Sequence, residues 1–503
     1  MLNLSSKINE LNPQFLREIK GRLKTRTLFL AIIISFIAQF IFIDQATIND
    51  TDFYQAVFDW VSLIAIFVLL VSGSHALIND LANEEKRGTL NFIRLSPQSS
   101  QSILFGKMLG VPIFWYIVIL LAIPFHLWLG INANLPLHQI LIFYVIVLAA
   151  IVFYYSGALL FSLVGSWLGR SQAGLSSGFL IVFLLLTQRE FYGKIPGFLV
   201  ILRLINPQYF IPNSGNNFSL VGFRWFGLPL GNNFAIVAGF SLLVYSIGTY
   251  FIWQSIERCY HAPHATMLSK KQSYLLTTSF TIITLGCVNS LNKESLISLI
   301  FLNFGLFLYL IAALTPNRQT LQDWARYQHI YSAKHPGKRK LIKDLIWGEK
   351  SPAVLAIAIN ALIVITSLSV SLSLSFNHGL DTLNAVVALI FTFSLLLIYA
   401  ALAQLILFTK NEQRLLWTNT TLAAAICLPP IVLGIVFSNT SHQFMWLFSI
   451  VAPVVILDVP LSAMVAFVAI LGHASILSLL LFQTKRRLQK AGESAIKALL
   501  AET

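Results

Sequence analysis

Charged residues are scarce in this chain. Asp, Glu, Lys and Arg make up 11% of its 503 residues, whereas apolar residues make up 56%. A soluble domain typically carries about 25% charged residues, because its surface must be hydrated. The few polar residues cannot cover the several domains that a soluble chain of this length would form. The composition therefore excludes an ordinary soluble protein and predicts that lipid surrounds much of the chain.

Cysteines and intramembrane charges are also rare. The three cysteines, Cys259, Cys287 and Cys427, lie in or beside apolar segments, and so small an odd set excludes a disulfide framework. Asp59 and His126 are almost the only ionisable residues inside apolar runs, so no proton relay or paired-charge ion site is visible. This scarcity argues against an ion-coupled secondary transporter and suits a pathway for an amphipathic or lipid-like substrate.

Two further absences limit the chemistry. The pattern G-x-x-x-x-G-K-[ST] does not occur, so the chain cannot hold a nucleotide through a P-loop. The predicted outer loops contain no acid pair and no histidine-rich set; Asp44, Asp50 and Asp52 are scattered among Thr, Asn and Gln. Such sets are what a membrane-embedded enzyme acting on lipid-linked substrates generally needs. That enzyme class stays open only as the alternative function.

Long apolar runs dominate what is present, and they predict an all-α, polytopic membrane protein. Twelve runs are long enough to cross about 30 Å of hydrocarbon as helices. They lie near residues 27–43, 57–78, 108–130, 137–165, 172–187, 233–254, 273–290, 294–314, 352–375, 382–408, 417–437 and 459–483.

The distribution of Lys and Arg predicts the orientation. With the N-terminus inside, the cytoplasmic segments carry 29 of the 34 basic residues, an asymmetry typical of inner or plasma membrane proteins. Both termini are then cytoplasmic. The net charge of +14 marks this face and its contact with anionic lipid headgroups, so a nucleic-acid partner is not needed to explain it.

Two apolar stretches do not fit as spans. Residues 195–212 are interrupted by prolines and contain Arg203, and residues 444–457 are short and contain Pro453. If the second stretch crossed, the basic C-terminal tail would lie outside. We expect both to be re-entrant or surface-lying helices on the outer side. Each half then has two spans, a charged cytoplasmic loop, three spans, an outer piece and a final span, a repeat that either chance or duplication explains.

The segment 12–26 predicts a basic amphipathic helix. Asn12 is a candidate N-cap and Pro13 suits the first helical position. Apolar residues recur every fourth position and basic residues occupy the other faces, as expected for a helix that lies in the inner membrane interface. Its predicted interfacial residues are Phe15, Arg17, Ile19, Lys20, Leu23 and Lys24.

The segment 83–107, NEEKRGTLNFIRLSPQSSQSILFGK, follows the second span. Gly88 allows a tight backbone approach, and Thr89 is a candidate cap for a short helix with Leu90, Ile93 and Arg94 on one side. Pro97 ends this helix, and a second amphipathic piece leads back into the membrane. A short charged helix held against the membrane is suited to contact a cytoplasmic partner.

This segment resembles the coupling-helix region of ATP-binding-cassette (ABC) permeases of the type-2 exporter class. The resemblance rests on acidic residues, a Gly-Thr-Leu, a Leu-Ser-Pro turn and an Ile…Gly-Lys ending, which here are Glu84, Glu85, Arg87, Gly88, Thr89, Leu90, Leu95, Ser96, Pro97, Ile103, Gly106 and Lys107. The helix at 12–26 and the outer piece at 195–212 match further parts of such permeases. The resemblance covers residues 1 to about 260 and is weaker beyond, where the basic loop 315–350 has no Glu-x-x-Gly-Thr-Leu pattern.

The resemblance implies a three-part organisation. Residues 1–26 form a connecting helix, residues 27–260 form a six-span permease domain with its coupling helix at 83–107, and residues 261–503 form a second six-span region that is a candidate degenerate repeat. Lys338 to Lys350 could supply another interfacial helix, with Leu341, Ile342, Leu345 and Ile346 on one side.

The resemblance also implies a function. The chain would be a transporting subunit without enzymatic activity or cofactor of its own, and two separate cytoplasmic ABC ATPase subunits would bind ATP and Mg²⁺. We predict that the ATPase docks on Glu84, Glu85, Arg87, Gly88, Thr89, Leu90, Arg94, Pro97, Gly106 and Lys107. Because the second half has no coupling motif, two chains, or this chain and a related permease, are expected to pair. A single-chain pseudo-dimer stays open, and the substrate is unidentified.

Two smaller patterns have local explanations. Gly165-x-x-x-Gly169 and Gly174-x-x-x-Gly178 flank the turn between the fourth and fifth spans, and small residues at this spacing allow close helix packing. Cys259, His261 and His264 could hold a soft metal with a fourth ligand, but an interfacial role is the simpler expectation.

Overall fold

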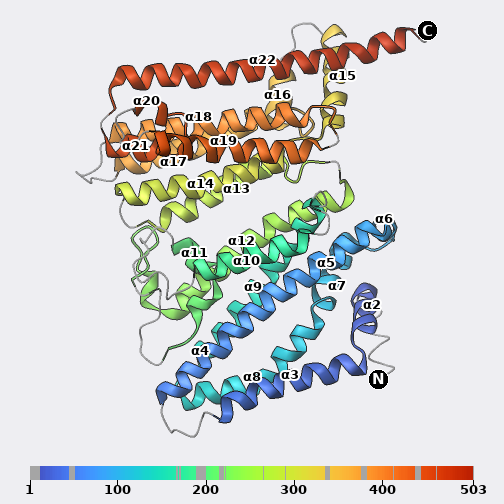
Figure 1. Cartoon of the computed structure of the whole chain (residues 1–503), viewed down its shortest axis with the longest axis vertical. Helices are drawn as coiled ribbons and strands as arrows, with labels where there is room; N and C mark the ends of the chain where they lie inside the picture. Colours follow the sequence, from blue (N-terminus) through green and yellow to red (C-terminus); the bar gives the residue numbers. More distant parts are fainter. Residues whose placement is uncertain are drawn as a thin grey trace. The chain divides into compact units, whose positions relative to one another are not determined.

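The computed structural model describes residues 12–44, 51–165, 168, 171–187, 200–213, 220, 222–263, 265–288, 291–334, 340–374, 382–411, 413–436, 443–459 and 461–501. Within them the fold is helical, and an isolated bridge between Trp225 and Leu228 is the only β-type pairing (Figure 1). The predicted all-α class is confirmed. The chain forms two compact units, one ending at Pro263 and the other following it. The division expected from the sequence lies close by, after residue 260.

The first unit begins with two helices joined by a sharp bend and continues with long helices broken by short ones. In order they are α2 (Pro13–Arg22), α3 (Thr25–Asp44), α4 (Thr51–Phe67), the π-helix η1 (Val68–Ser72), α5 (Gly73–Lys86), α6 (Thr89–Arg94), α7 (Ser100–Gly110), α8 (Ile113–Asn132), α9 (Leu137–Val164), α10 (Gln172–Leu186), α11 (Val200–Leu204), η5 (Pro207–Phe210), η6 (Leu230–Asn232) and α12 (Phe234–His261).

The second unit has its core between α13, α14, α17 and α18. Its helices are α13 (Lys270–Gly286), α14 (Lys293–Leu314), α15 (Arg318–Lys334), α16 (Lys340–Trp347), α17 (Val354–Leu374), α18 (Thr382–Leu407), α19 (Arg414–Val436), α20 (Gln443–Trp446), α21 (Ala452–Asp458) and α22 (Ala463–Ala501).

Nine helices of the described residues are long and apolar enough to cross a membrane, so the chain is a polytopic helical membrane protein. The bent pair α2–α3 raises the number to ten if it counts as one span. The predicted spans at 172–187 and 273–290 correspond to α10 and α13, which have only 15 and 17 residues. The total of twelve spans stays a prediction.

The second predicted span is part of one long helix. Residues Thr51–Lys86 form 36 continuous helical residues, with η1 inside. At this point the Tyr155 hydroxyl donates to the Leu69 carbonyl at 2.6 Å. A methyl group on Gly73 would meet the same hydroxyl at 1.7 Å, so only glycine fits there. The π-helix therefore lies at the close contact between α9 and this helix. The apolar run in the sequence does not reveal such a local change in helix type.

The two interrupted apolar stretches form only short helices. Residues 200–212 contain α11 and η5, and residues 444–457 contain the end of α20 and most of α21. The first stretch is held by neighbouring helices: Tyr154 and Tyr245 both donate to the Ile205 carbonyl, at 2.7 and 2.8 Å. Residues 195–199 lie outside the described residues. The outer-side placement of both stretches stays a prediction.

The loop 315–350 contains a helix that the sequence analysis did not predict. α15 packs along the C-terminal part of α22, where Leu321, Ala325 and Leu488 form a small buried cluster with Phe408. The short helix expected between 338 and 350 is present as α16. The Lys270 ammonium holds α16 to α13 by donating to the Leu345 carbonyl at 2.6 Å.

Candidate functional site

α2 begins as the sequence predicts and then turns sharply into α3. The Asn12 side chain accepts a hydrogen bond from the Phe15 amide at 3.0 Å, and Pro13 occupies the first helical position. α2 ends at Arg22, and the axes of α2 and α3 meet at 76°. The side chains that α2 buries are Gln14, Leu16 and Glu18, whereas the predicted apolar residues Phe15 and Ile19 are only half-buried.

The loop between α5 and α7 contains the short helix expected from residue 89 onward, but its start differs from the prediction. The N-cap position belongs to Gly88, which has a φ of 72°, and it has no side-chain cap. Thr89 is therefore not the cap; its hydroxyl donates to the Glu84 carbonyl at 3.1 Å. A methyl group on Gly88 would meet nothing within 4 Å, so glycine is needed here for its left-handed backbone and not for close packing.

α6 separates its apolar residues into two sets. Leu90 and Ile93 are buried at 2% and 7% exposure. Phe92 and Leu95, which we call the apolar tip, are 79% and 85% exposed. Because the first pair anchors the helix, the apolar tip projects from a fixed base.

A buried group of charges joins α2, α5 and α7 near α6. The Lys107 ammonium on α7 is completely buried and lies 2.6 Å from Asp80 Oδ2, 2.9 Å from Glu84 Oε1 and 3.6 Å from Glu18 Oε1. Asp80 and Glu84 are one turn apart on α5, and Glu18 comes from α2. Figure 1 shows α2, α6, α7 and the end of α5 gathered at one end of the first unit.

Two arginines of α2 complete this charge cluster, which comprises Glu18, Asp80, Glu84, Lys107, Arg17 and Arg22. Arg22 pairs with Glu18 at 3.1 Å and with Asp80, and the more exposed Arg17 lies 3.5 Å from Glu84. Three carboxylates thus face three cations. Burial lowers the pKa of Lys107, but the carboxylates of Asp80, Glu84 and Glu18 raise it by more, so the pKa of this amine lies above its ordinary value. Lys107 is therefore a cation at neutral pH.

α2 and α7 approach so closely that only glycine fits at two positions of α7. A methyl group on Gly106 would lie 2.6 Å from Asn12 Oδ1 and 2.9 Å from the Phe15 nitrogen. A methyl group on Gly110 would lie 2.5 Å from Glu18 Cβ. Gly106 and Gly110 have the small-xxx-small spacing, which brings the two helix backbones together and places Glu18 beside Lys107.

We expect Gly106→Ala to destabilise the packing of α2 by about 1–3 kcal/mol, because the new methyl group meets backbone atoms that cannot move independently. The measurement is thermal unfolding of the purified protein in mild detergent. Gly178→Ala is the matched control, since a methyl group there meets nothing within 4 Å and removing a helical glycine should be neutral or slightly stabilising. Equal melting temperatures for both variants would contradict the close approach.

The predicted docking residues divide into surface and interior positions. Glu85, Arg87, Gly88, Thr89 and Pro97 are exposed, and Arg94 is half-buried with its guanidinium 5.6 Å from the centre of the Tyr260 ring. Leu90, Gly106 and Lys107 are buried, and Glu84 is nearly so. These interior residues support α6 from inside. On the segment 12–26, Arg17, Lys20 and Lys24 are exposed, whereas Phe15, Ile19 and Leu23 are half-buried.

The members of the charge cluster, the apolar tip and the glycine pair that were not among the predicted site residues are Glu18, Arg22, Asp80, Phe92, Leu95 and Gly110. A signal existed for each polar one. Glu18 is an acid within a basic segment and lies four residues before Arg22, and Asp80 lies four residues before Glu84. The spacing of Gly106 and Gly110 was also visible. Phe92 has no such signal, because a sequence does not reveal which side of a six-residue helix is covered.

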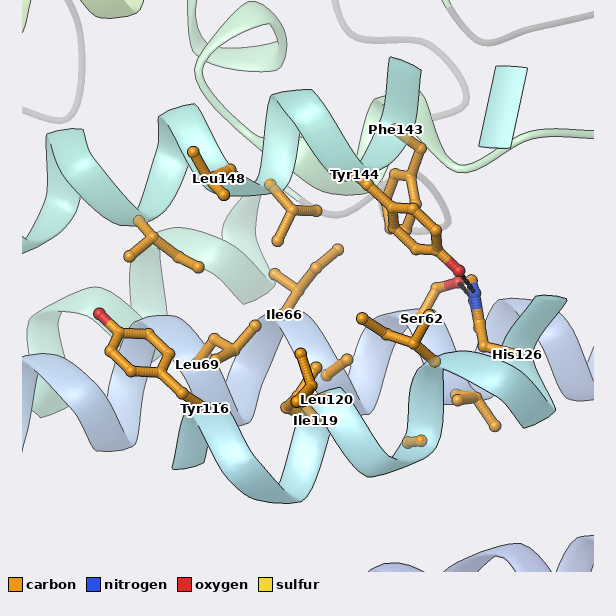
Figure 2. A pocket seen from close by; sticks show the side chains of 16 residues that line it. Ser62, Ile66, Leu69, Tyr116, Ile119, Leu120, His126, Phe143, Tyr144 and Leu148 are labelled. Carbon is orange, nitrogen blue, oxygen red and sulfur yellow. Dashed lines mark hydrogen bonds between the residues drawn. The ribbon is translucent and has the colours of Figure 1, made fainter. Parts of the chain in front are cut away.

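A cavity of about 290 Å³ lies within the first unit between α4, η1, α8 and α9. Figure 2 shows Tyr116 at one end and Ser62, His126 and Tyr144 at the other, with apolar side chains between them. Leu120 and Leu148, which help to line it, are each 66% exposed on the outside of the unit. The cavity wall is therefore continuous with the surface that lipid covers.

The polar end of this cavity is a chain of hydrogen bonds and not a nucleophile with its base. The Ser62 hydroxyl donates its single proton to the Phe58 carbonyl at 2.8 Å. The 2.7 Å hydrogen bond between Ser62 Oγ and His126 Nε2 must then be donated by the imidazole, and Nδ1 accepts from Tyr144 at 2.8 Å. In this tautomer His126 cannot remove a proton from Ser62.

Candidate metal ligands are few in the part of the chain that the structure describes. Glu18, Asp80 and Glu84 offer carboxylate oxygens within 4.8 Å of one another, but the Lys107 ammonium already lies among them. Of the sequence-based candidate Cys259, His261 and His264, the last lies outside the described residues. Cys259 is buried and His261 is exposed, so these two do not point to a shared ligand.

A scan against protein-family models found no match to this chain, and searches of curated proteins and of solved structures found none either.

Proposed function

We propose that this chain is the permease subunit of an ATP-driven ABC transporter, an exporter whose ATPase is a separate polypeptide. The observation that carries the proposal is the apolar tip. Phe92 and Leu95 are among the most exposed large apolar side chains of the described residues, and they lie beside polar and charged positions of the same loop. Aromatic and aliphatic side chains that project from a polar surface favour a protein partner.

The support beneath α6 suits the transmission of force. α6 follows directly on α5, the last part of the 36-residue helix Thr51–Lys86. The charge cluster fastens the end of α5 to α7 and α2, and α2 leads through the 76° bend into α3. A push on α6 would therefore reach two membrane helices together, because packed helices move as rigid elements.

The proposal includes an orientation and partners. Both termini and α6 face the cytoplasm of a cell bounded by an inner or plasma membrane, in agreement with the basic residues. α2 lies at the inner membrane interface, and the short helices α11, η5, α20 and α21 lie on the outer side. Two ABC ATPase subunits supply ATP hydrolysis and bind its Mg²⁺, and two copies of this chain, or this chain and a related permease, form the pathway.

The substrate class that fits best is amphipathic and lipid-like. The first-unit cavity is lined almost wholly by apolar side chains, and its polar groups are neutral and gathered at its ends. Such a lining offers no charge to attract a hydrophilic ion. Export of a lipid or of a glycan carried on a lipid agrees with this lining.

Co-purification tests the proposal. Tagged full-length protein, extracted from its native membrane in mild detergent, is expected to retain a polypeptide with a Walker A motif, and the complex should hydrolyse ATP. As a control, a tagged, unrelated polytopic protein purified from the same extract should retain no such ATPase. If no Walker-motif protein accompanies the chain, even after crosslinking in intact membranes, the proposed function is wrong.

A further inference from the structure

A cavity of about 770 Å³ lies within the second unit between α15, α16, α17, α18 and α22. Its lining changes character along its length. Toward one end are the polar side chains Gln328, Gln404, Thr484, Lys485 and Gln489, together with the apolar residues Trp324, Ala325 and Leu488. Toward the other are Ala358, Leu397, Leu477 and Leu481.

The helical positions of these residues give the spacing between the two ends. Leu397 precedes Gln404 by seven residues on α18, and Leu477 precedes Lys485 by eight on α22. At 1.5 Å per residue, the apolar and polar linings lie roughly 10–12 Å apart along both helices. The hydrogen bond from Arg487 Nη1 to the Leu405 carbonyl, at 3.3 Å, holds the polar ends of α18 and α22 at the same level.

Gln404 lines this cavity with an amide that nothing else engages. Its side chain is 1% exposed, and neither its nitrogen nor its oxygen has a hydrogen-bond partner among the described residues. A buried amide without partners is unfavourable, and natural structures keep such groups rarely. The amide can both donate to and accept from a polar group that enters the cavity.

The charges near the polar end favour an anion. Lys485 lines the cavity and is exposed, and Arg486 and Arg487 follow it. One carboxylate at this end, that of Asp344, accepts a hydrogen bond from the Gln328 amide at 2.7 Å. The run Lys485–Arg487 also ends the apolar part of α22, so the polar end lies where lipid headgroups begin.

We propose that this cavity binds a membrane phospholipid with an anionic headgroup. One acyl chain lies against Leu397, Leu477 and Leu481, and the phosphate group lies between the Gln404 amide and the Lys485 ammonium. Such a lipid is apolar at one end and anionic at the other, and the cavity offers an apolar lining at one end and the Gln404 amide and Lys485 ammonium at the other. Basic pockets between membrane helices bind acidic lipids through this combination. The site is independent of the proposed transport function and lies in the other unit.

Thermal unfolding of the purified full chain in mild nonionic detergent tests the site. The probes are dioctanoyl-phosphatidylglycerol, dioctanoyl-phosphatidylcholine, dioctanoylglycerol and glycerol phosphate. We expect phosphatidylglycerol to raise the melting temperature in a saturable manner. The zwitterionic lipid should need an about fivefold higher concentration, because its choline cation offsets one favourable charge contact with the basic run Lys485–Arg487, and such a contact is worth a factor of this size. The uncharged lipid and the headgroup without chains should have no saturable effect.

Two substitutions and one control locate the binding. Lys485→Ala should weaken phosphatidylglycerol binding about fivefold. Gln404→Leu should raise the melting temperature without lipid, because it removes the partnerless amide, and should weaken the binding of both phospholipids, because both carry the phosphate group that the amide contacts. Lys490→Ala, an exposed basic residue one turn further along α22, should leave the binding unchanged.

Some outcomes would overturn the proposal. One is that the anionic and zwitterionic lipids have equal effects on the wild type. Another is that Gln404→Leu binds lipid as the wild type does. A third is that Lys490→Ala loses as much affinity for phosphatidylglycerol as Lys485→Ala. If Gln404→Leu does not fold, Ala358→Trp, which fills the apolar end and keeps every polar group, should abolish the saturable effect of phosphatidylglycerol. Unchanged binding by that variant would likewise place the lipid elsewhere.

Discussion

Lys107→Met is expected to lower the free energy of unfolding of the first unit by about 3–5 kcal/mol, because it removes the cation from a buried group of carboxylates. In the native protein the Lys107 ammonium is within 3.6 Å of Glu18, Asp80 and Glu84. Methionine fills a similar volume but leaves these acids facing one another, with only two arginines at the edge. We expect α2 to separate from α7, since Glu18 is the acid that α2 contributes.

Chemical unfolding of the purified protein in mild detergent measures this loss, and limited proteolysis near Arg22 and Lys24 reports the release of α2. Lys86→Met is the control, because Lys86 is exposed in the last turn of α5 and a surface charge contributes about 0–1 kcal/mol. A loss for Lys107→Met no larger than that of the control would contradict the stabilising role of the charge cluster.

The pH dependence of this difference has a defined sign. Because the pKa of Lys107 is raised in the folded protein, its stabilisation is complete below the ordinary lysine pKa of about 10.4 and is lost as the pH rises through the folded value. Methionine has no amine to titrate, so Lys107→Met lacks this contribution at every pH. The difference in the free energy of unfolding between the two proteins should therefore shrink as the pH rises through the folded pKa of Lys107.

Replacing both Phe92 and Leu95 by alanine is expected to weaken the capture of the ATPase roughly a hundredfold, equivalent to about 3 kcal/mol, without changing the stability of the free protein. At 79% and 85% exposure, these side chains contribute little to the packing of α6, whose anchors Leu90 and Ile93 are unchanged. Large apolar side chains in the centre of a contact carry most of its binding energy.

The measurement is the amount of Walker-motif ATPase retained by the tagged variant, together with the ATPase activity of the complex. Phe179→Ala on α10 is the matched control, since Phe179 is 75% exposed but lies on a predicted lipid-facing helix away from α6. Wild-type capture by the double variant would move the docking surface away from the apolar tip. Reduced capture with an unchanged melting temperature would support it.

The local structure around this site was partly predictable. Asn12 and Pro13 start α2, and the apolar spacing of Leu90 and Ile93 marks the buried side of α6, because capping and helical periodicity act within a few residues. The role of Gly88 was predicted incorrectly. A methyl group on Gly88 would meet no atom within 4 Å, so the positive φ of this residue explains why glycine is present. The glycine that close packing requires is Gly106. A sequence shows where glycines are but not which helix approaches them.

The second unit shows the same limit. The loop 315–350 contains the helix α15, which was not predicted because its composition is mostly polar. Leu321, Trp324 and Ala325 do have helical spacing, and they pack on α22, a contact between residues more than 100 positions apart in the chain. The Gln404 amide is similar: the sequence places it on an apolar helix, but only the packing of α15, α16 and α22 around α18 shows that it lines a cavity.

The apolar runs alone were enough to predict a helical protein that crosses the membrane many times, and they located its long apolar helices, because an apolar run in lipid can satisfy its backbone only within a helix. Which charged and apolar residues face inward depends on how the helices pack. Lys107 and Glu84 occur in one loop motif with Arg87, yet the first two are enclosed and the third is exposed. That separation depends on Glu18 and Asp80 from two other helices, and such contacts form only when the helices pack.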